Sequence, residues 1–227
     1  MTEGGLQLLP FYLVCDESAS MAGVPIDAIN GSLPDLHAEI GSNPSVADKT
    51  RFCMIGFSDD ADVLLPLADL SDVTAMPKLS ANGGTNYKAA FEVLRRTIDS
   101  DVASLKGAGN VVYRPAVFFL SDGYPNDNHW QPAFQALTDP NWKYRPNVLA
   151  FGFGDADENI IRQVATTRAF MANGNTDLAD ALREFAQSLI RSIVNSVTPS
   201  ASNPSGGANL SMPDEVPGFT NISAPEI

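Results

Sequence analysis

Three short polar segments carry the side chains with the most chemistry to offer: residues 16–20 (DESAS), 83–86 (GGTN) and 121–123 (SDG). They supply two carboxylates and three hydroxyls, with no convincing His or Cys beside them. Oxygen donors suit a hard divalent cation, Mg²⁺, Mn²⁺ or Ca²⁺, better than zinc. In the first segment an oxygen-bearing side chain recurs at every second residue, which suits a loop curling round an ion. The candidate metal site consists of Asp16, Ser18, Ser20, Thr85 and Asp122.

The segments between these clusters have the pattern of an α/β domain. Six apolar runs predict strands buried on both faces or at an edge: Leu9–Cys15, Arg51–Phe57, Asp62–Leu67, Pro115–Leu120, Asn147–Phe153 and Ala169–Met171. Apolar residues spaced three and four apart predict helices at Pro25–Ile40, Tyr87–Leu105, near Asp157, and Thr176–Val197. Strands that alternate with helices predict a doubly wound, mostly parallel six-stranded sheet flanked by helices, in a Rossmann-like arrangement.

The predicted sheet also explains how distant polar clusters meet. Ligands of doubly wound sheets bind beyond the carboxyl ends of the strands, where the strand order reverses. With the predicted strands in the order 3-2-1-4-5-6, that reversal lies between the first and fourth strands. Asp16 and Asp122 would then emerge side by side, with the glycine-rich turn delivering Thr85 between them.

The three motifs, in this order, resemble the metal-ion-dependent adhesion site (MIDAS) of von Willebrand factor A (VWA) domains. Asp16-x-Ser18-x-Ser20, Thr85 in a GGT turn and Asp122 in an SDG turn match its five ligand positions. The resemblance covers about residues 9–197. It implies that the hydroxyls coordinate Mg²⁺ directly, that the aspartates act largely through water, and that a partner's Glu or Asp completes the shell. The sequence departs from the family pattern only at two non-ligand positions, Glu17 and Ala19.

Four stretches are similar to the bacterial tellurium-resistance TerY-like proteins: LPFYLVCDESASMAGVPIDAIN, ADVLLPLADL, LSANGGTNYKAAFEVL and PAVFFLSDGYPND. That resemblance implies a cytosolic, metal-dependent scaffold in a stress-response or phosphosignalling system. The partners it implies are a PP2C-type phosphatase, a Ser/Thr kinase, or both.

Composition narrows the classes of partner and the compartment. The 227 residues carry a formal charge of −13, which argues against binding to nucleic acid or to an anionic membrane. No apolar run approaches the ~20 residues of a membrane span, and the N-terminus lacks the cationic region of a secretory signal. We therefore expect a cytoplasmic protein in which Cys15 and Cys53 are reduced core residues.

The C-terminal stretch differs in composition from the rest of the chain. We expect residues 1–197 to form the VWA domain and residues 198–227, which contain five prolines among Ser, Gly and Asn, to form a flexible tail outside the core. Deletion after residue 197 would then change the melting temperature by less than about 2 °C. Spaced apolar residues in this stretch leave a docking peptide open as an alternative to an inert spacer: Leu210, Met212, Val216, Phe219 and Ile222.

Alternative interpretations remain for both the residues and the function. Taken alone, residues 16–20 could be a helix N-cap region. Gly152-Phe153-Gly154 suggests a dinucleotide loop, but Asp157 stands where a third glycine would fall. The leading functional prediction is a non-enzymatic, metal-dependent protein-interaction domain that binds a partner's acidic side chain. The alternatives are a metal-dependent hydrolase or phosphoryl-transfer enzyme that uses Asp16 or Asp122, and a domain whose metal only stabilises the fold.

Overall fold

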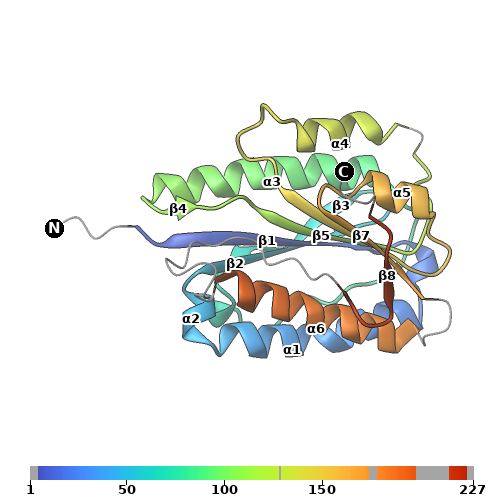
Figure 1. Ribbon diagram of the computed structural model, residues 1–227, viewed down its shortest axis with the longest axis horizontal. Coiled ribbons are helices and arrows are strands. Elements are labelled where there is room, and N and C mark those ends of the chain that lie inside the picture. The colour runs from blue at the N-terminus through green and yellow to red at the C-terminus, as the bar shows by residue number, and fades with distance from the viewer. Residues whose placement is uncertain (1–4, 128, 174–177, 198–214, 224–227) are drawn as a thin grey trace.

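The structure, a computed structural model, is an eight-stranded sheet between two layers of helices (Figure 1). It describes residues 5–127, 129–173, 178–197 and 215–223. The strands are β1 (Gln7–Asp16), β2 (Thr50–Phe57), β3 (Ala61–Ala68), β4 (Val111–Val112), β5 (Ala116–Ser121), β6 (Asn147–Gly152), β7 (Arg168–Ala172) and β8 (Phe219–Asn221). The helices are α1 (Val24–Gly41), α2 (Pro44–Ala47), α3 (Tyr87–Gly107), α4 (Gln131–Thr138), α5 (Glu158–Gln163) and α6 (Leu178–Val197).

The central strand, β1, is apolar at nearly every position because each of its faces packs on a different core. Phe11 and Leu13 belong to the core under α1 and α6, whereas Tyr12 and Val14 belong to the core under α3 and α4. Figure 1 shows α1, α2 and α6 on one side of the sheet and α3, α4 and α5 on the other. A strand covered on both faces needs apolar side chains at odd and even positions alike, and this pattern predicted β1.

The sheet order is β3-β2-β1-β5-β6-β7-β8, with β4 also paired to β1. The strands from β2 to β7 along this order are parallel, and only β3 and β8 are antiparallel to their neighbours. The predicted order and the predominantly parallel arrangement are confirmed. The prediction of six strands is wrong: β4 and β8 bring the number to eight in the described part of the chain. Both are too short, at two and three residues, to give a clear apolar run.

The helices α1, α3, α5 and α6 follow the four predicted positions, and α2 and α4 are additional to them. Pro34 lies inside α1 without ending it, so the helix runs unbroken from Val24 to Gly41. Asp157 caps α5 by accepting hydrogen bonds from the N–H groups of Asn159 and Ile160. Thr176, the expected first residue of the last helix, lies outside the described residues. No helix in the described part of the chain is both long and apolar enough to cross a lipid bilayer.

The segment after residue 214 corrects the expectation of a tail outside the core. Within residues 215–223, β8 pairs antiparallel with β7, and Val216, Phe219 and Ile222 are buried. The Phe219 ring lies edge-on to Phe151 of β6, with ring centroids 5.7 Å apart. These apolar residues therefore complete the domain's own sheet instead of serving as free docking anchors. Leu210 and Met212 lie outside the described residues.

Candidate metal centre

The candidate site lies where β1 and β5 end, at the point where the strand order reverses. The two strands are parallel neighbours, with Cys15 paired to Leu120 in register. Asp16 is the last residue of β1, and Asp122 follows the last residue of β5. Their carboxylates therefore emerge at the same edge of the sheet, as the sequence predicts, and are 0% and 7% exposed.

A chain of hydrogen bonds connects the first and third polar segments. Asp16 Oδ1 accepts a hydrogen bond of 2.8 Å from the Ser18 N–H. The Ser18 and Ser20 hydroxyls lie 3.0 Å apart, and the Ser20 hydroxyl donates to Asp122 Oδ1 at 2.8 Å. Ser18 does occupy the N-cap position of a short 3-10 helix at Ala19–Met21, but its side chain makes no capping hydrogen bond. Its hydroxyl thus faces the other site residues, which argues against a simple capping role.

Thr85 reaches the site from the turn before α3. Its backbone N–H donates to Asn126 Oδ1 at 2.8 Å, and its carbonyl accepts from the Asn126 N–H at 3.0 Å. A Cβ built on Gly123 would lie 3.8 Å from the Thr85 hydroxyl and 4.0 Å from the Ser20 hydroxyl. Glycine at this position therefore leaves open a space that both hydroxyls border. Hydrogen bonds thus connect Asp16, Ser18, Ser20 and Asp122, and the Thr85 and Ser20 hydroxyls both lie beside Gly123.

Several residues that hold the site side chains in place could not be predicted from the sequence. The Ser121 hydroxyl donates to Asp16 Oδ2 at 2.6 Å and accepts from the Tyr87 hydroxyl at 2.9 Å. Sequence analysis assigned Tyr87 only to the apolar face of a helix, although a phenol buried beside a polar cluster needs a partner. Asp59 accepts a hydrogen bond from the Gly84 N–H at 2.9 Å and so holds the turn that carries Thr85.

The electrostatics of the site show uncompensated negative charge. Burial raises the pKa of Asp16 to about 6, although hydrogen bonds from Ser121 and Ser18 favour the ionised form; the nearby Asp122 adds a smaller upward effect. Burial also raises the pKa of Asp122, with a further contribution from Asp155. Among the described residues, no Lys or Arg contributes to either shift. A bound cation would supply the missing positive charge.

Glu17, one of the departures from the family pattern, makes its side-chain contacts outside the five site residues. Its Oε1 accepts a hydrogen bond from the Ser80 N–H at 2.6 Å, and its Oε2 lies only 1.9 Å from a Cβ built on Gly56. The side chain therefore packs over Gly56 of β2, where a larger residue would collide with it.

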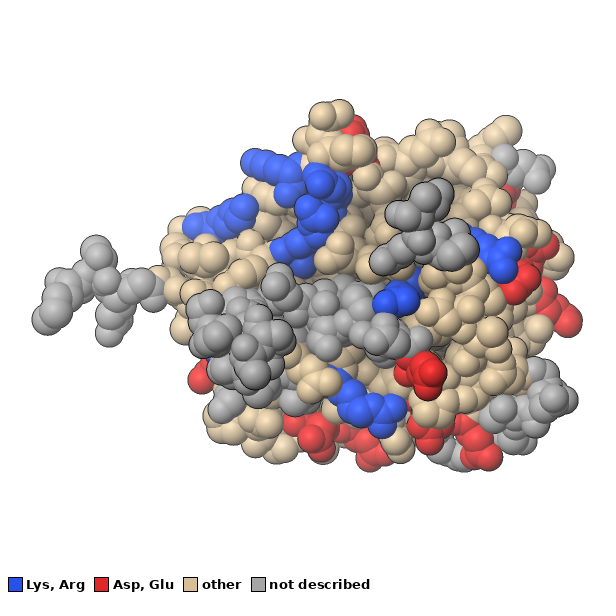
Figure 2. Space-filling view, viewed as in Figure 1, with Lys and Arg blue, Asp and Glu red and all other residues tan. Residues whose placement is uncertain are grey.

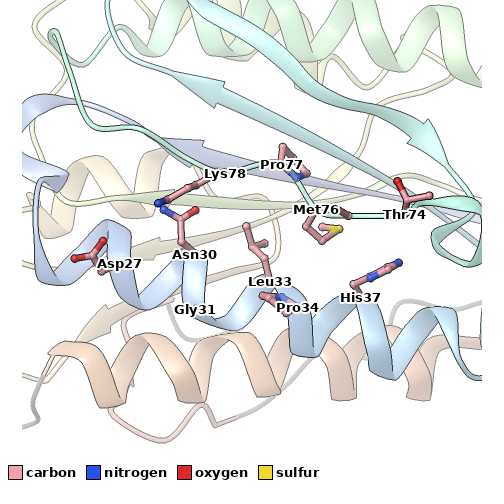
Figure 3. A pocket seen from close by; sticks show the side chains of 11 residues that line it. Asp27, Asn30, Gly31, Leu33, Pro34, His37, Thr74, Met76, Pro77 and Lys78 are labelled. Carbon is pink, nitrogen blue, oxygen red and sulfur yellow. The ribbon is translucent and has the colours of Figure 1, made fainter.

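The described residues contain no group of three or more His, Cys, Asp or Glu side chains placed to hold a metal, so the donors here are mainly hydroxyls. A separate groove of about 550 Å³ lies between α1 and the segment before α3 (Figure 3). Leu33 and Met76 line it, together with Asp27, His37 and Lys78, and none of the five site residues does. The candidate site, at the carboxyl ends of β1 and β5, is therefore distinct from this groove.

Comparison with known families decides the classification. The family model of the von Willebrand factor type A domain matches residues 11–188, which is well over half of the chain. The chain belongs to this family. VWA domains are typically modules of metal-dependent protein interaction or adhesion. None of the curated proteins compared with the chain matches it.

Solved structures agree on the VWA fold. Pilus adhesin SpaC from Lactobacillus rhamnosus GG, in an open conformation, is 14% identical over 84% of this chain and 31% of its own, with a TM-score of 0.63. Proximal thread matrix protein 1 from the mussel byssus, in a form with a zinc-occupied MIDAS motif, is 17% identical over 84% of this chain and 48% of its own. Its TM-score is 0.59. The ArnB paralog VWA2 from Sulfolobus acidocaldarius is 20% identical over 79% of this chain and 45% of its own, with a TM-score of 0.56. This VWA domain chain spans less than half the length of each of these proteins.

Proposed function

We propose that this VWA domain binds a divalent cation through Asp16, Ser18, Ser20, Thr85 and Asp122, and uses it to bind an acidic side chain of a protein partner. The main support is that hydrogen bonds connect two buried carboxylates of raised pKa with Ser18 and Ser20, while the Thr85 and Ser20 hydroxyls both lie beside Gly123. Within the described residues, no basic side chain offsets this charge.

The donor set fits a hard cation. The Ser18 and Ser20 hydroxyls carry no charge, and the Thr85 hydroxyl has no hydrogen-bond partner among the described residues, so each can serve as a ligand. The two carboxylates offset the charge of +2 without quenching it at the metal, because in this proposal the uncharged hydroxyls make the direct bonds and the carboxylates act through water. When bound, the cation supplies a positive centre that a partner's carboxylate can join.

Mg²⁺ is the cation we propose, with Mn²⁺ and Ca²⁺ as alternatives, because every donor is oxygen. Since a mussel VWA protein holds zinc in its MIDAS, zinc belongs in the same test. Calorimetric titration of the EDTA-stripped full chain with each metal would rank them. We expect Thr85→Ala to weaken Mg²⁺ binding, whereas Thr74→Ala, a threonine exposed beside the Figure 3 groove, leaves it unchanged. Equal Mg²⁺ affinity in both variants would refute this site.

For the biological role, we propose a cytoplasmic scaffold in a bacterial tellurium-resistance-like stress response, with a PP2C-type phosphatase or a Ser/Thr kinase as partner. This finer proposal is supported only by the TerY-like stretches of sequence. Proteins captured on the immobilised chain in Mg²⁺, released by EDTA and identified by mass spectrometry would test it. A metal-dependent partner of another class would overturn the phosphosignalling role and leave the metal-bridged contact standing.

We propose that the domain is not an enzyme. A general base or nucleophile must reach its substrate, whereas both carboxylate oxygens of Asp16 are engaged by Ser18 and Ser121 within the protein. Turnover of a generic phosphoester by the metal-loaded protein, lost in Asp122→Asn, would instead favour the hydrolase alternative. Loss of partner binding in EDTA at a temperature where the fold survives would exclude a metal that only stabilises the domain.

A further inference from the structure

Five of the 14 Lys and Arg residues of this acidic chain lie close together on one face. Figure 2 shows Lys and Arg gathered over α3 and the segment before β6, whereas most of the visible Asp and Glu lie along the lower and right edges of the view. Arg95, Lys106 and Lys143 each lie over the ring of Trp142 or Tyr144. Arg145 follows Tyr144, and Arg114 lies level with it, since each precedes the paired residues Ala116 and Asn147 by two positions. We call these five residues the basic face. Without them the chain would carry a formal charge of −18 instead of −13.

Two aromatic rings hold much of the basic face in place. The Arg95 guanidinium lies 4.7 Å from the centroid of the Trp142 ring. The ammonium groups of Lys106 and Lys143 lie 5.0 Å and 4.6 Å from the centroid of the Tyr144 ring. The two rings are themselves 6.3 Å apart, which makes a continuous platform. Cations stacked on rings lose side-chain freedom before any ligand arrives, so less entropy remains to be lost on binding.

The basic face also lacks ion pairs. Other cations pair with carboxylates, such as Arg51 with Asp69 at 3.3 Å. No residue of the basic face has such a pair within the part of the chain that the structure describes. Asp99 acts electrostatically on Lys143, and the Asp139 carbonyl accepts a hydrogen bond from the Trp142 N–H, but neither residue forms an ion pair with the face. Its positive charge is therefore available to a ligand.

The basic face is separated from the candidate metal centre. α3 begins at Tyr87, beside the site, and its 21 residues extend about 30 Å to the end that carries Lys106. Arg114 and Arg145 precede the first residues of β5 and β6, at the opposite ends of these strands from the candidate metal centre. A ligand of the basic face therefore need not contact the metal site.

We propose that the basic face is a metal-independent docking surface for an acidic segment of a protein partner. A short Glu- or Asp-rich segment can stay within the face, where the Debye length of about 8–10 Å screens the surrounding negative charge. A nucleic acid is a less suitable ligand, because an extended polyanion would run onto the strongly acidic remainder of the surface. This surface goes beyond the proposed metal-bridged contact and does not depend on it.

Fluorescence anisotropy tests this proposal with a labelled peptide of about ten glutamates. The full chain is kept in EDTA and roughly 50 mM salt, so that the metal centre cannot contribute. We expect binding that weakens about tenfold when the salt is raised to roughly 300 mM. Lys106→Gln/Lys143→Gln should weaken it by a further factor of roughly five, because both cations lie on the face.

A matched variant, Lys78→Gln/Arg191→Gln, removes the same charge elsewhere on the surface and should leave the affinity within about twofold. Equal weakening by the two double variants would show attraction to overall charge and overturn the docking surface. Absence of binding would also overturn it. Tighter binding of an oligothymidylate with a similar number of charges would reassign the face to nucleic acid. Loss of Mg²⁺-dependent partner binding in Thr85→Ala would leave these results unchanged, which keeps the two proposals separable.

Discussion

The Ser20 hydroxyl donates a hydrogen bond of 2.8 Å to Asp122 Oδ1, across 102 positions of sequence. This bond joins the loop after β1 to the loop after β5. It also joins a carboxylate of raised pKa to a hydroxyl that lies beside Gly123. A cation bound there would compete with this hydrogen bond for both oxygens, so metal binding and local loop geometry are coupled.

The first prediction is stabilisation by metal. A ligand of the native state alone, at a hundredfold excess over its Kd, adds about 2.7 kcal/mol to the free energy of unfolding. For a chain of this length we expect Mg²⁺ or Mn²⁺ to raise the melting temperature by roughly 5–10 °C. Asp122→Asn should abolish the rise, while Asp72→Asn, on the exposed segment after β3, should retain it. An undiminished rise in Asp122→Asn would place the metal elsewhere.

The second prediction concerns pH in the absence of metal. Burial raises the pKa of Asp16 from an ordinary value of 3.8 to about 6, so between these values the folded protein binds more protons than the unfolded chain. The contribution of this group to stability therefore decreases as the pH rises from about 4 to about 6 and stays lowest above that range. Asp16→Asn removes the ionisation. It should stabilise the EDTA-treated protein at pH 7.5, relative to wild type, by up to about 3 kcal/mol more than at pH 4.

Urea denaturation of both proteins at the two pH values measures this difference. With Mg²⁺ in excess, wild type should be more stable than Asp16→Asn at pH 7.5, because the substitution also removes a charge that the cation needs. An equal effect of Asp16→Asn on stability at the two pH values in EDTA would contradict the pKa shift on which the prediction depends.

The third prediction tests the hydrogen bond from Tyr87 to Ser121. Tyr87→Phe removes a buried donor to the hydroxyl that orients Asp16, so we expect a loss of about 1 kcal/mol in stability. Mg²⁺ affinity, measured by calorimetry, should weaken about threefold to tenfold, because the carboxylate loses part of its support. Tyr113→Phe is the matched control, since its hydroxyl donates to the exposed Gln7. Unchanged Mg²⁺ affinity in Tyr87→Phe would limit this tyrosine to packing.

The sequence was most informative where one physical requirement fixes the residue type. A strand covered on both faces must be apolar throughout, which identified β1 and β5. Parallel neighbouring strands must end at one edge, which brought Asp16 and Asp122 together. Their partners were harder to predict, because Asp59 and Asn126 support the Thr85 turn through side-chain bonds to backbone N–H groups. Such bonds depend on loop geometry and leave no periodic pattern.

The edge strand β8 could not be predicted from the sequence for a different reason. Its sequence, Phe219–Asn221, is too short for a period-two pattern to be distinguished, and it follows a stretch rich in proline, glycine and serine. Composition alone therefore assigned it to a tail. Pairing with β7 depends on tertiary contacts, chiefly the contact of Phe219 with Phe151, which no local propensity encodes.

The fourth prediction follows from this contact and reverses the expectation for the C-terminus. Deletion after residue 197 would expose the edge of β7 and remove three buried apolar residues, Val216, Phe219 and Ile222. Phe219→Ala, which deletes one of these side chains at the sheet edge, should cost about 2–4 kcal/mol. We therefore expect a fall of roughly 5–15 °C in melting temperature for this variant and at least as much for the truncation.

Val111→Ala, at a side chain that is 53% exposed, serves as a control and should change the melting temperature by less than about 2 °C. If truncation left the melting temperature within about 2 °C of wild type, β8 would contribute nothing to stability. Residues 215–223 would then be available to a partner, as the alternative of a docking peptide requires.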